Sequence, residues 1–351
     1  MNSYDSYSNE ANLDRWYPKR KLNICILGGT GFVGKWLVNS LLRLHELGEY
    51  EVTLHIVTRN TQKSKGIFPQ RFKQNIHWIE NDLKLNTINN LPLVEFYVNG
   101  PTPSVVDSSS ISQESLMQVT LNGVNSIKES LRNCTFTPRV INLSSGAVYS
   151  RARTEDSPHL ESDSVIDVST DLYASAKVQS ERFLQSMNDS NEISLLNLRL
   201  FSFYGPHLPL DKHFAIGNFM QDIISGKLIT VRGNSSTKRS FLYGADLATA
   251  ILRALFSNYR GTLNIGGKNA ISMESLAKLM DRTLEGQGVN FLGEGLDSNY
   301  YYPSTSLSHE ILGSYENTPF QVGLNKWKKW LLKSAMIENE PTRATMDKEW
   351  S

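Results

Sequence analysis

The sequence predicts an α/β protein with a doubly wound parallel sheet and a smaller C-terminal α/β lobe. Over the first 200 residues, short apolar runs alternate with stretches of helical periodicity, which is typical of strands and helices that wind a parallel sheet. A glycine cluster lies between the first apolar run and the first helical stretch, where such folds make a tight strand-to-helix turn. At about 150 residues per domain, a chain of 351 residues is long enough for one large and one small unit.

The expected elements follow one another in a regular order. Leu22–Leu27 is a short apolar run that predicts a buried strand, and Phe32–Leu47 has apolar residues at helical spacing. A second helix is expected around Leu116–Leu131. Further strands are expected at the remaining apolar runs, which are Val52–Val57, Ile76–Ile79, Leu93–Val98, Val140–Leu143 and Ile193–Leu200.

After residue 201 the alternation weakens, and glycine, proline and polar turns become denser. This change of pattern divides the chain into an N-terminal extension (1–20), a dinucleotide-binding domain (21–200), a smaller substrate-binding lobe (201–340) and a tail (341–351). Segments around residues 236–266 are expected to return to the first domain.

Charge and apolar patterning exclude several classes of protein. The 36 basic residues nearly balance the 35 acidic ones, which argues against a nucleic-acid partner held by bulk charge and against a disordered chain. No run approaches the ~18 apolar residues that a membrane span needs, and the first 20 residues lack a signal peptide's apolar segment. Cys25 and Cys134 have no metal-ligand spacing. We therefore expect a cytoplasmic protein with no membrane partner and no metal site.

The glycine cluster, Gly28-Gly29-Thr30-Gly31-Phe32-Val33-Gly34, predicts a dinucleotide site of the Rossmann type. Glycines permit the tight turn, the close approach of backbone to a pyrophosphate and the packing of helix on strand. The helix start then offers free N–H groups and a positive dipole end to the phosphates. The candidate cofactor-binding residues of this turn are Gly28, Thr30, Gly31, Phe32, Val33 and Gly34.

Residues after the second and third strands bear on which cofactor is bound. Arg59 follows the second strand, where a carboxylate would bind the ribose hydroxyls of NAD and an arginine suits the 2′-phosphate of NADP. NADP is therefore favoured over NAD, although Arg59 could also be a solvated residue of a basic loop. Asp82 and Leu83 follow the third strand. The Asp82 carboxylate could contact the adenine amino group, or it could simply form a turn.

Three polar residues form a candidate catalytic group. Tyr173 and Lys177 are four residues apart and so share one face of a helix, although that spacing is also common by chance. An ammonium beside a phenol favours the phenolate, which could then take a proton from a hydroxyl or return one to a ketone. Ser145 ends a strand 28 residues before Tyr173, and its hydroxyl could hydrogen-bond the reacting oxygen.

These residues resemble the extended short-chain dehydrogenase/reductases, and among them the NAD-dependent epimerase/dehydratase family of nucleotide-sugar enzymes. The glycine turn, the Ser-Ser-Gly-Ala-Val-Tyr turn and the Tyr173/Lys177 pair all match motifs of that family. The resemblance covers roughly residues 22–335 and includes Leu198–Pro206, Lys238–Ala248 and Asn264–Gly267.

The resemblance implies roles for individual residues. It implies that Ser145, Tyr173 and Lys177 are a catalytic triad, with Tyr173 and Lys177 also contacting the cofactor. It implies that Arg239 and Asn218 contact the pyrophosphate of a nucleoside diphosphate sugar. It also implies a homodimer.

Two departures from the family pattern narrow the expected reaction. Gly146 and Ala147 stand where the 4,6-dehydratases carry Asp-Glu, and neither can act as an acid or base. This disfavours a dehydratase and leaves a C4 epimerase or a 4-ketoreductase as the leading expectation. The alternatives are a reductase of small carbonyl compounds similar to the dihydroflavonol reductases and a non-catalytic, cofactor-sensing protein. Arg239 and Asn218 argue against the former, and the intact Tyr173/Lys177 pair argues against the latter.

Overall fold

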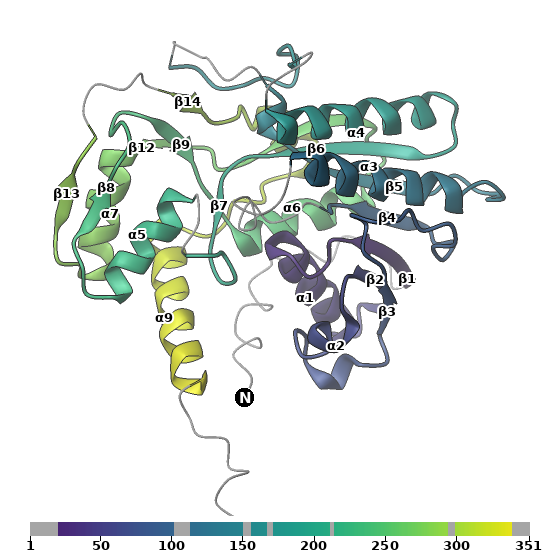
Figure 1. Cartoon of the computed structure of the whole chain (residues 1–351), viewed down its shortest axis with the longest axis horizontal. Helices are drawn as coiled ribbons and strands as arrows, with labels where there is room; N and C mark the ends of the chain where they lie inside the picture. The colour runs from purple at the N-terminus through teal and green to yellow at the C-terminus, as the bar shows by residue number, and fades with distance from the viewer. Residues whose placement is uncertain are drawn as a thin grey trace, which may run out of the picture.

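A computed structural model describes residues 20–101, 113–149, 156–166, 171–210, 214–293 and 299–338. The predicted tail, and the predicted N-terminal extension except Arg20, lie outside these residues. The described chain is built around a seven-stranded parallel sheet with the strand order β11-β6-β5-β4-β1-β2-β3 (Figure 1). From β3 to β6 this is the 3-2-1-4-5-6 order of a doubly wound Rossmann sheet. The predicted fold class is therefore confirmed.

Six of the seven strands begin and end within a few residues of the predicted apolar runs, because those runs are the buried strands of a parallel sheet. The seventh strand, β11, corresponds to no predicted run. In chain order the strands are β1 (Arg20–Leu27), β2 (Tyr50–Thr58), β3 (Ile76–Glu80), β4 (Phe96–Asn99), β5 (Arg139–Ser145), β6 (Ser194–Leu200) and β11 (Gly261–Ile265). The major helices beside them are α1 (Phe32–Glu46), α3 (Gln113–Ser130), α4 (Leu172–Asp189) and α6 (Gly244–Phe256). Two short helices, α2 (Thr61–Ser64) and η1 (Gln70–Phe72), lie between β2 and β3.

Successive strand residues point to opposite faces of the sheet, and each face has its own core. Ile24 and Ile26 of β1 belong to the core beneath α1 and α6. Cys25 and Leu27, which alternate with them, belong to the core beneath α3 and α4. The helices therefore cover both faces of the sheet, as Figure 1 shows.

The smaller lobe packs around a separate core and lies beside the carboxyl ends of the strands (Figure 1). Its helices are α5 (Ala215–Ile224), α7 (Met273–Leu284) and α9 (Phe320–Glu338). Its short strands are β7 (Phe203–Tyr204), β8 (Ile229–Val231), β9 (Lys238–Ser240), β10 (Leu242–Tyr243), β12 (Ala270–Ser272), β13 (Val289–Phe291) and β14 (Tyr300–Tyr301). Helix α8 (Ser306–Leu312) packs on β11. Because α6 and β11 belong to the large unit, the chain after residue 201 contributes to both parts.

Three asparagines form a polar ladder inside the sheet. Asn99, Asn142 and Asn197 occupy matching positions on β4, β5 and β6. The Asn99 amide donates to Asn142 at 2.9 Å, and the Asn142 amide donates to Asn197 at 2.8 Å. Buried amides need such partners, so the ladder fixes the register of the three strands below the edge at which β5 ends.

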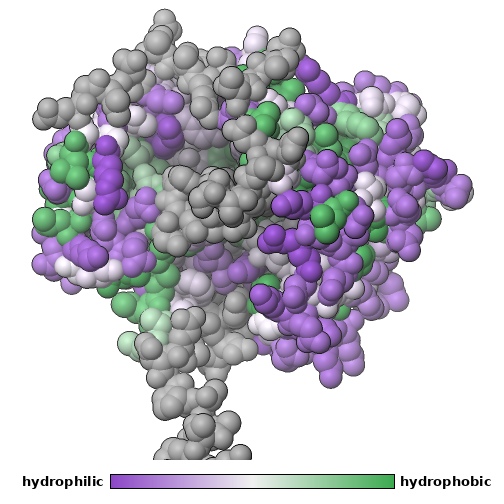
Figure 2. Space-filling model, in the orientation of Figure 1, coloured by the Kyte–Doolittle hydropathy of each residue, from purple (hydrophilic) through white to green (hydrophobic). Residues whose placement is uncertain are grey.

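The chain has a negative mean hydropathy of −0.33, so it is hydrophilic on average. Figure 2 shows a largely hydrophilic face on which apolar residues occur in separate small patches. No helix within the described ranges is long and apolar enough to cross a bilayer. Nor do the described residues bring together three side chains that could hold a metal ion.

Candidate active site

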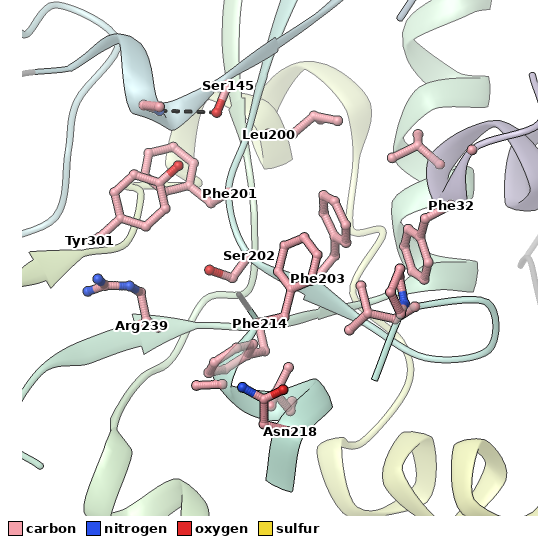
Figure 3. A pocket seen from close by; sticks show the side chains of 18 of the residues that line it. Phe32, Ser145, Leu200, Phe201, Ser202, Phe203, Phe214, Asn218, Arg239 and Tyr301 are labelled. Carbon is pink, nitrogen blue, oxygen red and sulfur yellow. Dashed lines mark hydrogen bonds between the residues drawn. The ribbon is translucent and has the colours of Figure 1, made fainter. Parts of the chain in front are cut away.

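A cavity of about 820 Å³ lies between the sheet and the smaller lobe. The sheet side contributes the glycine turn and the ends of β5 and β6, and α4 contributes Tyr173 and Lys177. The lobe contributes residues from α5, β8, β9 and β14 (Figure 3). The carboxyl edge of a doubly wound sheet is where such folds bind their ligands.

The first and last glycines of the turn, Gly28 and Gly34, are required by close packing. Gly28 has a φ of +93°, and a Cβ on it would lie 2.6 Å from the Gly100 oxygen. A Cβ on Gly34 would lie 2.3 Å from the Gly28 oxygen, within the turn itself. The middle glycine has more room, since a Cβ on Gly31 would approach nothing closer than 3.6 Å. The turn therefore holds α1 tightly against β1.

The start of α1 faces the cavity without a side-chain cap. Gly31 is the N-cap residue and provides no side-chain hydrogen bond, while Thr30, Phe32 and Val33 line the cavity. Uncapped N–H groups at a helix start are an anion site. A backbone that has no Cβ at Gly28 and Gly31 lets a phosphate approach, so the turn fits the pyrophosphate of a dinucleotide.

Ser145 is the last residue of β5 and lines the cavity. Its hydroxyl caps the short helix η3 (Gly146–Val148) by accepting a hydrogen bond from the Ala147 N–H at 3.1 Å. Tyr173 lines the same cavity, and the Ser145 hydroxyl acts to lower the pKa of its phenol. The structure thus brings together the predicted serine and tyrosine, which are 28 residues apart in the sequence.

Tyr173 and Lys177 lie on one face of α4, as their spacing predicts. Asp171 begins the helix by accepting from the N–H groups of Tyr173 and Ala174 at 3.1 and 3.2 Å. The Lys177 Nζ lies 6.0 Å from the centre of the Tyr173 ring and donates to the Leu143 oxygen at 2.8 Å.

Burial shifts the acid–base chemistry of both residues. Burial lowers the pKa of Lys177 to about 8, against the opposing effect of Glu181. Burial raises the pKa of Tyr173, while the Ser145 hydroxyl acts to lower it. Perturbed groups in a cleft are typical of functional sites.

A buried polar network lies behind the lysine, and sequence analysis did not find it. Glu181, one helical turn after Lys177, receives hydrogen bonds from the Arg199 guanidinium at 3.0 and 2.7 Å and one from the Ser144 hydroxyl. Arg199 also donates to the Tyr149 hydroxyl at 2.9 Å. The only sequence signal was the four-residue spacing from Lys177 to Glu181, which places both on one helix face.

The smaller lobe contributes to the cavity the two residues expected to contact a substrate pyrophosphate. Asn218 comes from α5 and Arg239 from β9 (Figure 3). Arg239 is held in place by its Nη1, which donates to the backbone oxygens of Lys238 and Asn299 at 2.8 and 2.9 Å. Its guanidinium carbon lies 5.3 Å from the centre of the Tyr301 ring. A fixed, half-buried guanidinium is suited to a phosphate.

Three predicted cofactor residues do not line this cavity. Arg59 is exposed after β2. The Asp82 carboxylate accepts from the Lys84 N–H at 2.9 Å, which is the turn-forming alternative. Leu83 is buried in the core beneath α3 and α4. Their proposed contacts with an adenosine end of the cofactor stay predictions.

The cavity also contains residues that sequence analysis did not select. Lys35 lines the cavity directly after Gly34, and burial lowers the pKa of its ammonium. His207 lies beside it, with a pKa lowered to about 3 by burial and by the Lys35 charge. Tyr301 enters from β14. The signals were the position of Lys35 beside the glycine turn and the aromatic run Tyr300–Tyr302, neither of which specifies a long-range contact.

Comparisons with known proteins identify related sequences. The model of the NAD dependent epimerase/dehydratase family matches residues 24–266. UDP-glucuronic acid decarboxylase 3 of Arabidopsis thaliana is 24% identical over 314 residues, which cover 86% of this chain and 87% of the relative. The match thus extends over most of both chains.

Solved structures share the fold. UDP-N-acetylglucosamine 4-epimerase from Methanobrevibacter ruminantium superposes with a TM-score of 0.77 at 20% identity, covering 90% of this chain and 99% of that one. UDP-glucuronic acid 4-epimerase from Bacillus cereus, solved with UDP-glucuronic acid and NAD, superposes with a TM-score of 0.73 at 20% identity, covering 89% and 100%. Both likenesses extend over the sheet and the smaller lobe.

Proposed function

The chain belongs to the NAD dependent epimerase/dehydratase family, and we propose that it transfers a hydride at C4 of a nucleoside diphosphate sugar, as a C4 epimerase or a 4-ketoreductase. The observation that best supports this proposal is the composition of one cavity. The cavity joins the α1 helix start, the Ser145–Tyr173–Lys177 group and Arg239. In this proposal the one cavity therefore contains two anion sites and one acid–base group.

The cofactor assigned to this site is NAD or NADP. The glycine turn and the uncapped start of α1 would hold its pyrophosphate, and Tyr173 and Lys177 would contact its nicotinamide half. Arg59 favours NADP, whereas the Bacillus cereus structure contains NAD. When bound, the cofactor accepts a hydride from the sugar carbon and returns it.

Tyr173 is the proposed acid–base residue. Its phenolate oxygen takes the proton of the C4 hydroxyl as the sugar is oxidised, and its phenol returns that proton as the ketone is reduced. The Lys177 ammonium, 6.0 Å from the ring centre, stabilises the phenolate. Ser145 donates a hydrogen bond to the reacting oxygen and holds it beside Tyr173.

The surroundings of Gly146 support an oxidoreduction without elimination. A Cβ at this position would lie 2.7 Å from the Phe201 ring and 2.8 Å from the Tyr301 hydroxyl. A carboxylate side chain therefore has no room here without a shift of those rings. Elimination of water needs an acid or base beyond Tyr173, and neither Gly146 nor Ala147 can supply one.

Arg239 and Asn218 define the substrate end of the proposal. Arg239 would pair with the diphosphate, while Asn218 would donate its amide to the same group. A small carbonyl compound without phosphates needs neither residue. The proposal extends to a homodimer in the cytoplasm, for which sedimentation and fractionation are the direct measurements.

Two assays test the proposal and separate its two forms. In the first, NADPH or NADH is mixed with a nucleoside diphosphate 4-keto-6-deoxysugar, and loss of the reduced-nicotinamide absorbance indicates a ketoreductase. In the second, UDP- and dTDP-hexoses are incubated with enzyme and cofactor, and formation of the C4 epimer without net cofactor reduction indicates an epimerase. If the protein bound no nucleoside diphosphate, a reductase of small carbonyl compounds would be favoured. Unchanged cellular function in Tyr173→Phe would favour a cofactor sensor.

A further inference from the structure

Glu181 lies one helical turn after the lysine of the proposed acid–base group. Side chains four residues apart on a helix are neighbours on its surface, and opposite charges at that spacing attract each other. Lys177 and Glu181 of α4 are both buried, and the attraction between charges is stronger where water is excluded. The helix itself therefore offers Lys177 a partner that would compete with Tyr173.

The structure gives both carboxylate oxygens of Glu181 to other partners. The Arg199 Nε donates to Oε1 at 3.0 Å, and the Arg199 Nη2 donates to Oε2 at 2.7 Å. The Ser144 hydroxyl also donates to Oε1. Two parallel N–H groups of an arginine fit a carboxylate better than a single ammonium does. Arg199 and Ser144 are therefore the groups that hold Glu181.

Lys177 is directed elsewhere. One of its three N–H groups donates to the backbone oxygen of Leu143 at 2.8 Å. The ammonium lines the cavity and lies 6.0 Å from the centre of the Tyr173 ring. Its remaining donors are therefore placed to serve Tyr173 and a bound cofactor.

The sheet presents Ser144 and Arg199 to α4 as a pair. They are register partners on β5 and β6, so their side chains project from the same face of the sheet, on which α4 packs (Figure 1). Arg199 is fixed from its other side, because its Nη1 donates to the Tyr149 hydroxyl at 2.9 Å, and that hydroxyl donates to Asn264 of β11 at 2.7 Å. The guanidinium is thus held by three strands' worth of contacts before it meets Glu181.

We propose that Arg199 is a positioning residue that holds Glu181 away from Lys177 and thereby leaves the Lys177 ammonium to Tyr173 and the cofactor. Without Arg199, Glu181 loses two of its three hydrogen bonds and pairs with Lys177. The proposal rests on the assignment of Lys177 to the acid–base group. It goes further in giving the buried network behind α4 a part in that group's chemistry.

The test follows the ionisation of Lys177 in the protein without cofactor or substrate. Lysines labelled with ¹³C at Cε are titrated by NMR, and Lys177→Met identifies the Lys177 signal, with a pKa near the value of about 8 in wild type. In Arg199→Met the pKa of Lys177 is expected to rise by roughly one to two pH units, because a nearby carboxylate favours the ammonium. Arg132→Met, which removes an exposed arginine from its ion pair with Glu129, is the matched control and should leave the signal unchanged.

A double substitution shows whether Arg199 acts through the charge of Glu181. In a Glu181→Gln background the carboxylate is absent, so Arg199→Met is expected to add no rise in the pKa of Lys177. A change of packing alone would instead shift the signal equally in both backgrounds.

Two milder variants keep the proposal testable if Arg199→Met does not fold. Ser144→Ala removes one partner of Glu181, and Arg199→Lys keeps a cation but not the two-pronged contact, so each should raise the pKa of Lys177 by less than Arg199→Met. An unchanged Lys177 titration in folded Arg199→Met, or in both milder variants where Arg199→Met is unfolded, would overturn the proposal. An equal rise with and without the Glu181 carboxylate would also overturn it. Since no ligand is used, these outcomes are independent of whether the proposed sugar reaction is found.

Discussion

At the scale of single residues, the fold changes the chemistry of Lys177 through burial. The side chain is 4% exposed, and its pKa is lowered to about 8 from 10.5. An ammonium loses hydration when it is buried, so the folded chain binds this proton less tightly than the unfolded chain does. The same burial brings the lysine close to Tyr173, where its charge is needed.

This shift predicts a pH dependence of stability. Between pH 8 and 10.5 the unfolded chain retains the Lys177 proton while the folded chain releases it, so the free energy of unfolding gains a contribution that increases with pH. Below pH 8 both states are protonated and the cost of burial is constant. Urea unfolding of wild type and Lys177→Met should show a stability difference that moves in favour of wild type by on the order of 2–3 kcal/mol across this window. A difference that does not vary with pH would contradict the shift.

At the scale of elements, the glycine turn sets a sharp packing requirement. Gly34→Ala is expected to abolish measurable cofactor binding and to lower Tm, because its Cβ would lie 2.3 Å from the Gly28 oxygen. Calorimetric titration with NAD and NADP measures the binding, and Gly66→Ala is the matched control because its Cβ would meet nothing within 4 Å. Cofactor binding by Gly34→Ala at wild-type affinity would contradict the assigned site.

The network behind α4 gives a second prediction for the elements. Arg199→Met leaves the Glu181 carboxylate buried without its charge partner, and such losses typically cost about 3–5 kcal/mol. Urea unfolding should show a destabilisation of that size. The control is Lys278→Met, whose partner Glu274 is about half exposed and whose loss should cost less than about 1 kcal/mol. Equal effects of the two substitutions would show that the Arg199 network adds no stability.

The local sequence predicted helices and strands well where a single pattern, such as an apolar run or a helical period, marks the element. Six strands of the sheet contain continuous apolar runs, and α1 is marked by the glycine turn and by its periodic apolar residues, so their bounds came close to the structure. Strand β11 (GTLNI) has no such run and was not predicted. The short strands β7 to β14, apart from β11, have two to three residues each, too few for a period to be read. The approach of Tyr301 to Gly146 and the Arg199–Glu181 pair depend on tertiary packing, which no local pattern encodes.

At the scale of the whole molecule, the cavity joins two proposed anion sites that are far apart in the sequence. The near-neutral total charge hides them, because each depends on a few fixed groups and not on a basic surface. The sheet supplies one site at the start of α1, and the lobe supplies the other at Arg239. The proposed acid–base group lines the same cavity, at the carboxyl edge of the sheet.

This arrangement predicts that the two sites can be separated by substitution. Arg239→Met should weaken UDP or dTDP binding by roughly 10- to 100-fold, the value of a hydrogen-bonded charge, and leave the Kd for NAD or NADP unchanged. Calorimetric titration with each ligand is the measurement. Lys227→Met, an exposed cation of the same lobe, is the control. A loss of cofactor affinity in Arg239→Met would contradict the assignment of the cofactor to the start of α1 and of the substrate diphosphate to Arg239.

The most direct test of hydride transfer at this site is the reduced-nicotinamide absorbance of wild type and Tyr173→Phe during incubation with nucleoside diphosphate hexoses and 4-ketohexoses. Wild type is expected to oxidise or reduce its cofactor with at least one of these sugars, in a single turnover or continuously. Tyr173→Phe should bind both ligands and react about 10²- to 10⁴-fold more slowly. If Tyr173→Phe transferred hydride at the wild-type rate, or if wild type bound both ligands and transferred none, the proposed chemistry would be wrong.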